Sequence, residues 1–167
     1  GSDLQGVKST ALRQGDHYLL NGSKTFITNG WHADLVIVVA KTNPAAGAKG
    51  TSLLLVERGM PGFETGKRLK KVGLKAQDTA ELFFSDVKVP AENLLGGAAQ
   101  ENRGFICLME QLPWERLQIA IGAVASAQAS IDGTLAYVKD RKVFGQAVAA
   151  YQNTRYKLAE MQTEVQI

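Results

Sequence analysis

The chain has 167 residues, of which 45% are apolar and 21% charged, and its formal net charge is +3. This composition is ordinary for a globular protein, and a single cysteine, Cys107, excludes an internal disulfide. Two histidines and one cysteine, far apart in sequence, predict no metal site. The longest apolar run, Leu35–Ala40, is too short to cross a membrane, so no span is predicted.

Residues 1–97 have the pattern of strands and turns. Tyr18–Leu20 and Lys24–Thr28 are β-forming runs separated by Asn21-Gly22-Ser23, and Asn-Gly between such runs predicts a hairpin turn. Leu35–Ala40 is unbroken and rich in β-branched residues, which predicts a buried strand. The other predicted strands are Thr51–Glu57, Phe63–Leu69 and Ala80–Val89. Short strands with regular turns predict a small antiparallel sandwich or barrel.

Lys67–Lys71 is a dense cluster of cations within this half. Such a run can meet phosphate or nucleic acid, but it is more often a solvated face. No aromatic residue interleaves with the cluster, which disfavours a platform for single-stranded nucleic acid. We therefore predict no nucleic-acid partner.

Residues 98–167 have a helical pattern. Apolar residues recur at helical spacing from Arg103 to Ala136, and many small residues among them favour close helix packing. Pro113 should kink or open this helix just before Glu115. The helix should end at Gly145, and a second should begin near Ala150. The predicted class is therefore α+β, with a middle β-domain at 1–97 and the first helices of a C-terminal bundle at 98–167.

Both ends of the chain look cut. Gly1-Ser2-Asp3 opens abruptly, and Met161–Ile167 lies inside a helical pattern with no capping signal. We expect a piece of a larger protein, in which other segments or another subunit complete the bundle. Gly-Ser at a chain start is also typical of a cloning remnant, which leaves Ser2 open to that interpretation.

The stretch LPWERLQIAIGA, residues 112–123, places Glu115–Arg116 before an apolar helical run. A carboxylate beside a helix kink and apolar neighbours can have its pKa raised by desolvation and act as a general base. The alternative is an exposed ion pair on a solvent-facing stripe, which the spacing alone favours.

Five motifs occur in an order that resembles one family. They are GSDLQGVKSTA, NGSKTFITNG, ELFFSDVKVPAENLLG, the RGF…LPWERLQIAIGA run and YVKDRKVFGQAVAAYQ. Each is weak alone, but together they resemble the acyl-CoA dehydrogenases over essentially the whole chain. The resemblance implies FAD as cofactor, bound between the β-domain and the helical bundle.

The resemblance also implies roles for individual residues near the flavin. Ser2 matches the end of a glycine-rich loop near the flavin diphosphate and the acyl-CoA. Phe26, Ile27 and Thr28 match the strand beside the isoalloxazine ring, with Thr28 near its N5 edge. Most family members carry tryptophan where this chain has Phe26. Without the resemblance, these residues would simply belong to a hairpin.

A second group of cofactor residues lies near the bundle helices. Arg141 resembles the family arginine that reaches the FAD diphosphate of a neighbouring subunit, and Val143 and Phe144 follow in the same loop. Tyr151 and Gln152 stand at the spacing of further cofactor contacts. These contacts imply a homo-oligomer, a dimer or a homotetramer built as a dimer of dimers.

In the family the catalytic base is a glutamate that lies either late in the chain, as in many members, or on the first bundle helix. The resemblance to the second type implies Glu115 as the base. In isovaleryl- and long-chain-type members a glutamate of the first bundle helix abstracts the α-proton of a fatty acyl-CoA, in a Glu-Arg pair. The β-hydrogen leaves as hydride to FAD, giving trans-2-enoyl-CoA, a step of fatty acid β-oxidation. Arg116 would bind the acyl-CoA or orient Glu115. Pro113 replaces an aspartate that contacts CoA in some other members.

Two alternatives compete with this interpretation. One is an acyl-CoA oxidase or flavin monooxygenase on the same fold, although such relatives often lack an acid at the position of Glu115. The other is a fragment that has no catalytic activity in isolation. The resemblance further implies electron-transferring flavoprotein as partner and either bacterial cytoplasm or mitochondrial matrix as compartment.

Overall fold

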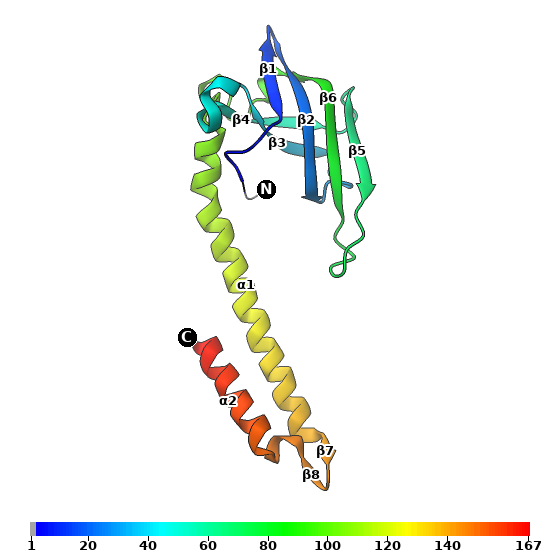
Figure 1. Ribbon diagram of the computed structural model, residues 1–167, viewed down its shortest axis with the longest axis vertical. Helices are drawn as coiled ribbons and strands as arrows, with labels where there is room; N and C mark the ends of the chain where they lie inside the picture. Colours follow the sequence, from blue (N-terminus) through cyan, green and yellow to red (C-terminus); the bar gives the residue numbers. More distant parts are fainter. Residues whose placement is uncertain (1–2) are drawn as a thin grey trace. The chain divides into compact units, whose positions relative to one another are not determined.

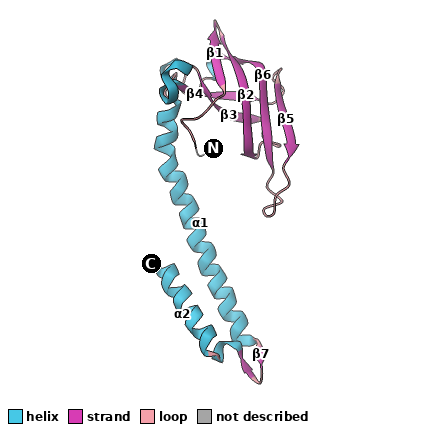
Figure 2. Ribbon diagram, in the orientation of Figure 1, coloured by secondary structure: helices cyan, strands magenta, loops and turns pink. Residues whose placement is uncertain are grey.

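The computed structural model describes residues 3–167, and the chain divides into two compact units, Gly1–Met109 and Glu110–Ile167 (Figure 1). The first unit is rich in strands and the second is helical (Figure 2). The α+β class, with a sheet-rich part followed by the start of a helical domain, is confirmed. The predicted domain boundary after residue 97 stays a prediction.

One six-stranded sheet builds the first unit. Its spatial order is β4-β3-β1-β2-β6-β5, so β4 and β5 form the two edges. The pairs are antiparallel except β1 and β3, which meet in parallel at Thr10 and Lys41. The strands are β1 Thr10–Gln14, β2 His17–Thr28, β3 Leu35–Lys41, β4 Thr51–Glu57, β5 Phe63–Arg68 and β6 Thr79–Pro90.

The core of the sheet comes from alternating positions on the strands, as the two-residue period of a strand requires. Tyr18 and Leu20 of β2 are fully buried, and they pair with Val89 and Val87 of β6, which are also buried. The other members of the cluster are Ala11, Val38, Ala40, Leu54, Val56, Leu82, Phe84 and Leu94.

The hairpin predicted at Asn21-Gly22 is wrong. β2 runs through both residues, and the chain turns instead at Gly15, which has φ +62°. Asn21 pairs through its backbone with Thr10, and its side-chain amide both accepts from Asp86 N–H and donates to the Asp86 carboxylate, at 2.9 Å each. Strands on both sides of β2 therefore hold this segment extended.

The buried strand predicted at Leu35–Ala40 is only half buried. β3 exposes Leu35 and Ile37 on one face, at 53% and 56%, while Val38 and Ala40 enter the core. The predicted strands at 51–57, 63–69 and 80–89 are confirmed with small shifts at their ends. β-Branched composition predicted the strand but not which of its faces is covered.

Helix α1 spans Gly104–Asp140. Its residues up to Met109 belong to the sheet unit and the rest to the second unit, which also contains α2 Gln152–Gln166. α1 stays helical through Pro113, so the predicted local opening is wrong. A proline costs the helix one backbone donor, and the turns on either side hold it here. α1 ends at Asp140 rather than at Gly145, because β7 Lys142–Val143 and β8 Gln146–Ala147 form a small hairpin before α2.

Candidate functional site

The end of β2 carries the first group of predicted site residues. Before the bulge, the side chains of Tyr18, Leu20 and Lys24 face inward. Between Lys24 and Ile27 the strand has one residue more than β6. This β-bulge reverses the phase of the strand. Ile27 packs against the core, while Phe26, 75% exposed, and Thr28 face outward. A regular strand would have turned both inward.

The bulge places Phe26 at φ +58°, a conformation that is unfavourable for a residue with a side chain. Such backbone strain is concentrated at binding and catalytic sites in known proteins. Beyond the bulge, Asn29 N–H donates to the Asp78 carbonyl at 3.2 Å. The Asp78 carboxylate, nearly buried, accepts from Trp31 N–H at 2.8 Å. These contacts anchor the strand end that presents Phe26 and Thr28.

Lys24 lies directly before this bulge, and no motif in the sequence marks it as a site residue. Its Nζ donates to the Val39 carbonyl at 2.6 Å, and Ser9 Oγ donates to the same carbonyl at 3.3 Å. The lysine lines a cavity of about 190 Å³ whose other walls are mostly aliphatic, including Ile27. Burial lowers the pKa of Lys24 to about 8.

The buried Lys24 should make the protein more stable as pH rises, and replacing it with methionine should remove that dependence. The native state releases the Lys24 proton near pH 8, whereas the unfolded chain holds it to the ordinary pKa of 10.5. The unfolded state thus binds more protons between these values, and stability increases with pH there. Melting temperatures measured from pH 7 to about pH 10 should rise more in the native protein than in Lys24→Met. The exposed control Lys88→Met should keep the native slope, and a slope shared by all three proteins would contradict the burial of Lys24.

The second group of site residues surrounds the hairpin of β7 and β8. Phe144 and Gly145 both have positive φ, 48° and 83°, as a two-residue turn of the mirror type requires. The Phe144 side chain is 98% exposed. Tyr151 Oη donates to the Val143 carbonyl at 2.9 Å, and Val148 N–H donates to the Arg141 carbonyl at 2.9 Å. The turn therefore exposes the Phe144 ring to solvent, and these two hydrogen bonds hold the backbone of the hairpin that carries it.

Two polar residues of this group keep their functional atoms available. The Arg141 guanidinium is exposed and has no ion pair among residues 3–167. Gln152 begins α2, and its amide donates to Tyr156 Oη at 2.8 Å, which leaves the amide oxygen free to accept. A guanidinium with no carboxylate partner is suited to a diphosphate, which it binds through paired donors.

Glu115 and Arg116 lie on α1, and both side chains are exposed within this chain. The burial expected around Glu115 is not provided by residues 3–167. Along α1, 25 residues separate Glu115 from Asp140, which is about 37 Å at 1.5 Å per residue. The structure therefore brings the residues around Arg141 together but keeps them far from Glu115. Ser2 lies outside the described residues.

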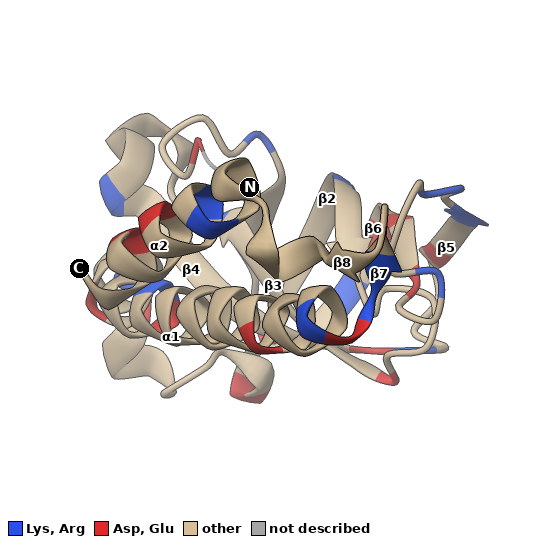
Figure 3. Cartoon of the chain, turned by 90° about the horizontal axis from the view of Figure 1, so that it is seen from below, with Lys and Arg blue, Asp and Glu red and all other residues tan. Residues whose placement is uncertain are grey.

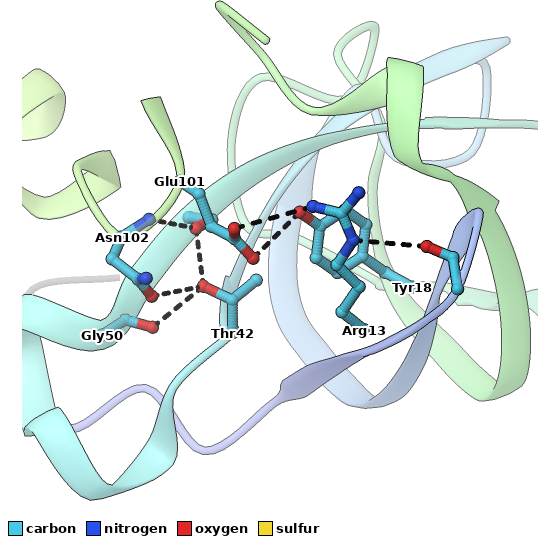
Figure 4. A network of polar contacts seen from close by, with 8 residues as sticks. Arg13, Tyr18, Thr42, Gly50, Glu101 and Asn102 are labelled. Carbon is cyan, nitrogen blue, oxygen red and sulfur yellow. Dashed lines mark hydrogen bonds and ion pairs between the residues drawn. The ribbon is translucent and has the colours of Figure 1, made fainter. Parts of the chain in front are cut away.

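A polar network fixes the segment that leads into α1 (Figure 4). Glu101 accepts from Tyr18 Oη at 2.9 Å and lies 3.9 Å from the Arg13 guanidinium, which stacks over the Tyr18 ring. The hydrogen bond to Glu101 and burial both raise the pKa of the Tyr18 hydroxyl, burial more strongly. Long-range polar contacts of this kind leave no periodic signal in the sequence.

The next residue, Asn102, extends this network to β4. Its N–H donates to Ser52 Oγ at 2.8 Å, and its side-chain oxygen accepts from Thr42 at 2.8 Å. Gly104 begins α1 two residues later, and a Cβ at that position would meet the Ser52 backbone at 2.9 Å. The network therefore sets the start of α1 against the sheet and is structural.

Two family models match the chain. The model described as acyl-CoA dehydrogenase, middle domain, matches residues 1–87, and the model described as acyl-CoA dehydrogenase, C-terminal domain, matches residues 102–167. These ranges include the β2 bulge, α1 and the β7–β8 hairpin. The chain belongs to the acyl-CoA dehydrogenase family.

Individual relatives refine this assignment. The long-chain specific acyl-CoA dehydrogenase, mitochondrial, of Sus scrofa is 56% identical over 167 residues, 99% of this chain and 38% of the relative. The isovaleryl-CoA dehydrogenase, mitochondrial, of Pongo abelii is 45% identical over 99% of this chain and 39% of its own length. The crystal structure of acyl-CoA dehydrogenase from Geobacillus kaustophilus has 53% identity and a TM-score of 0.93, covering 99% of this chain and 43% of that one. The chain thus spans less than half the length of these relatives.

By length and composition, α1 is also apolar enough to cross a membrane. The core helix of a helical domain has the same length and composition. Because residues 102–167 match the C-terminal domain of the family, we assign α1 to that domain. The absence of a membrane span stays a prediction.

Proposed function

We propose that this chain is the central part of an FAD-dependent acyl-CoA dehydrogenase that converts a saturated acyl-CoA thioester to trans-2-enoyl-CoA. The observation that carries the proposal is the Glu115–Arg116 pair on the first bundle helix, in a chain similar throughout to long-chain and isovaleryl-CoA dehydrogenases. An acid at this position suits removal of the α-proton and gives oxidase or monooxygenase chemistry less support.

The residues around the proposed flavin site fit the cofactor. Phe26 offers an aromatic face to a flavin ring, and Thr28 has an exposed hydroxyl that can donate to its edge. Arg141, which has no ion pair among the described residues, would hold the diphosphate. FAD, when bound, supplies the acceptor for the β-hydride. Ile27, Val143, Phe144, Tyr151 and Gln152 complete the proposed cofactor contacts.

Glu115 would accept the α-proton at a carboxylate oxygen. A carboxylate is a weak base in water, and covering it removes solvation and strengthens it. Within this chain Glu115 is exposed, so substrate and neighbouring segments would supply that cover. Arg116 would bind the acyl-CoA or orient the Glu115 carboxylate, and Ser2 would lie near substrate and cofactor.

The distance along α1 supports an oligomer. Glu115 and Asp140, the residue before Arg141, lie about 37 Å apart along α1, as the rise per residue of a helix requires. One flavin near Glu115 would therefore receive Arg141 from another copy. We propose a dimer or a tetramer in which the hairpin of β7 and β8 reaches the cofactor of a neighbouring subunit.

Replacing Arg141 with leucine should weaken FAD retention by about 10- to 100-fold, because a charged hydrogen-bond donor to phosphate contributes about 1.5–3 kcal/mol. The release of FAD during dialysis of the complete protein measures this effect. Lys142→Leu is the matched control, since it removes a neighbouring cation that points to no predicted contact. Equal loss of flavin in both variants would show that Arg141 acts only through net charge.

The proposed partners follow the family. Electron-transferring flavoprotein would reoxidise the flavin, and the compartment would be bacterial cytoplasm or, as in the mitochondrial relatives, the matrix. The proposed reaction would be a step of fatty acid β-oxidation.

The function is tested with the complete protein loaded with FAD. Addition of a saturated acyl-CoA without oxygen should bleach the oxidised flavin absorbance, and slow recovery on admitting air would identify a dehydrogenase. Rapid recovery with peroxide formation would identify an oxidase, and no bleaching would exclude both. If the 167-residue chain alone retained FAD tightly, this result would count against the alternative in which the isolated fragment cannot bind the cofactor.

A further inference from the structure

The end of β5 and the turn that joins it to β6 carry an unusual concentration of positive charge. Residues 67–78, here called the basic loop, contain five of the 19 Lys and Arg but one of the 16 Asp and Glu. The rest of the chain therefore has 14 cations against 15 acids, so the basic loop accounts for the whole positive balance. The cations beside β5 are visible in Figure 3. The five cations are Lys67, Arg68, Lys70, Lys71 and Lys75.

These cations are not neutralised locally. None of them has a carboxylate within 4.0 Å in residues 3–167. Asp78, the acid of the basic loop, is 4% exposed and accepts from Trp31 N–H. Four of the cations and Asp78 line an open basin of about 330 Å³, so cations outnumber acids in its lining. The basin therefore has the charge and the size to receive anionic groups.

The basic loop also has an apolar tip. Val72 and Leu74 are 103% and 82% exposed, and Leu74 lies at φ +46°, where a branched side chain is unfavourable. The loop is nevertheless ordered by its own hydrogen bonds, since Lys71 Nζ donates to the Gln77 carbonyl and Gln77 N–H donates to the Leu74 carbonyl. Two aliphatic side chains are thus exposed to water, with lysines on both sides of them in the chain.

We propose that the basic loop docks the protein on an anionic phospholipid surface, with Val72 and Leu74 entering the headgroup region. Clustered lysines attract anionic bilayers, and exposed aliphatic groups add affinity by leaving water. Nucleic acid fits less well, because residues 67–78 contain no aromatic side chain for stacking. A protein partner also fits less well, because binding hot spots favour Trp, Tyr and Arg, whereas four of the five cations are lysines.

The complete protein is tested by sedimentation with phosphatidylcholine vesicles, with and without phosphatidylserine. Binding should require phosphatidylserine and weaken with added salt. Lys70→Glu with Lys75→Glu should lower the vesicle affinity by about 25-fold or more, because each lysine near an anionic bilayer contributes about fivefold. Val72→Ser with Leu74→Ser should also lower it. Lys49→Glu with Lys88→Glu, an equal charge change at exposed sites outside the basic loop, should bind like the native protein.

Several results would overturn the proposal. They are absence of binding by the native protein, unchanged affinity in either basic-loop variant, and an equal loss in the Lys49 and Lys88 control. Binding to soluble polyglutamate or DNA but not to vesicles would assign the loop to another acidic macromolecule. Release from vesicles by inorganic phosphate beyond that caused by chloride at equal ionic strength would assign it to free phosphate. None of these measurements depends on catalytic activity.

Discussion

Replacing Glu115 with glutamine should slow flavin reduction by a saturated acyl-CoA by about 10²- to 10⁴-fold, the usual contribution of a general base. Glutamine keeps the shape of the side chain, but its amide does not take up the α-proton. The rate is measured in the complete, FAD-loaded protein by mixing it with acyl-CoA without oxygen and following the loss of flavin absorbance.

Glu110→Gln is the matched control for this variant. Glu110 is an exposed acid on the same helix, so its replacement makes the same change in charge without touching the proposed base. Flavin content and melting temperature of both variants should equal those of the native protein. Reduction of the Glu115→Gln flavin at the native rate would place the base at another residue.

Replacing Gly22 with alanine should destabilise the sheet unit by about 2–5 kcal/mol. Gly22 has φ +136°, and a left-handed backbone costs a residue with a side chain about 1–2 kcal/mol. A Cβ there would also lie 2.7 Å from Ser9 Cβ and 2.8 Å from Ser9 Cα, and overpacking of this kind costs about 1–3 kcal/mol. Chemical denaturation followed by a signal from the sheet measures the loss.

Gly59→Ala separates the two contributions. Gly59 has φ +92°, but a Cβ there would meet no atom within 4 Å. Its replacement should cost only the backbone part, about 1–2 kcal/mol. Equal destabilisation by both substitutions would mean that the close approach of Ser9 to Gly22 relaxes easily.

Local patterns predicted most of the elements. β-Branched runs marked the strands, and helical spacing marked α1 and α2, because these signals depend on residues close in the chain. The turn at Asn21-Gly22 was wrong because the pairing of β2 with β1 and β6 overrides a local preference. The half exposure of β3 also depends on distant segments, which a run of apolar letters does not report.

The candidate site was predicted through family motifs rather than through local chemistry. The exposure of Phe26 and Thr28 depends on one extra residue in β2 relative to β6, and a register between strands is invisible in one sequence. Lys24 was missed for the same reason, since its partner Val39 lies on β3. Glu115 was predicted as a site residue because an ion pair before an apolar run is unusual. The pattern did not identify the segments that would bury its carboxylate.

The two irregularities along β2 lie on opposite strands. Near Asn21 the extra residue belongs to β6, and near Phe26 it belongs to β2. The two shifts cancel, so Ile27 and Thr28 pair with β6 in the same register as Tyr18 and Leu20 do. The core pairs of Tyr18 and Leu20 are thereby separated from the strand end that presents Phe26. Because Phe26 is 75% exposed, replacing it with the larger tryptophan should require no compensating change in the core.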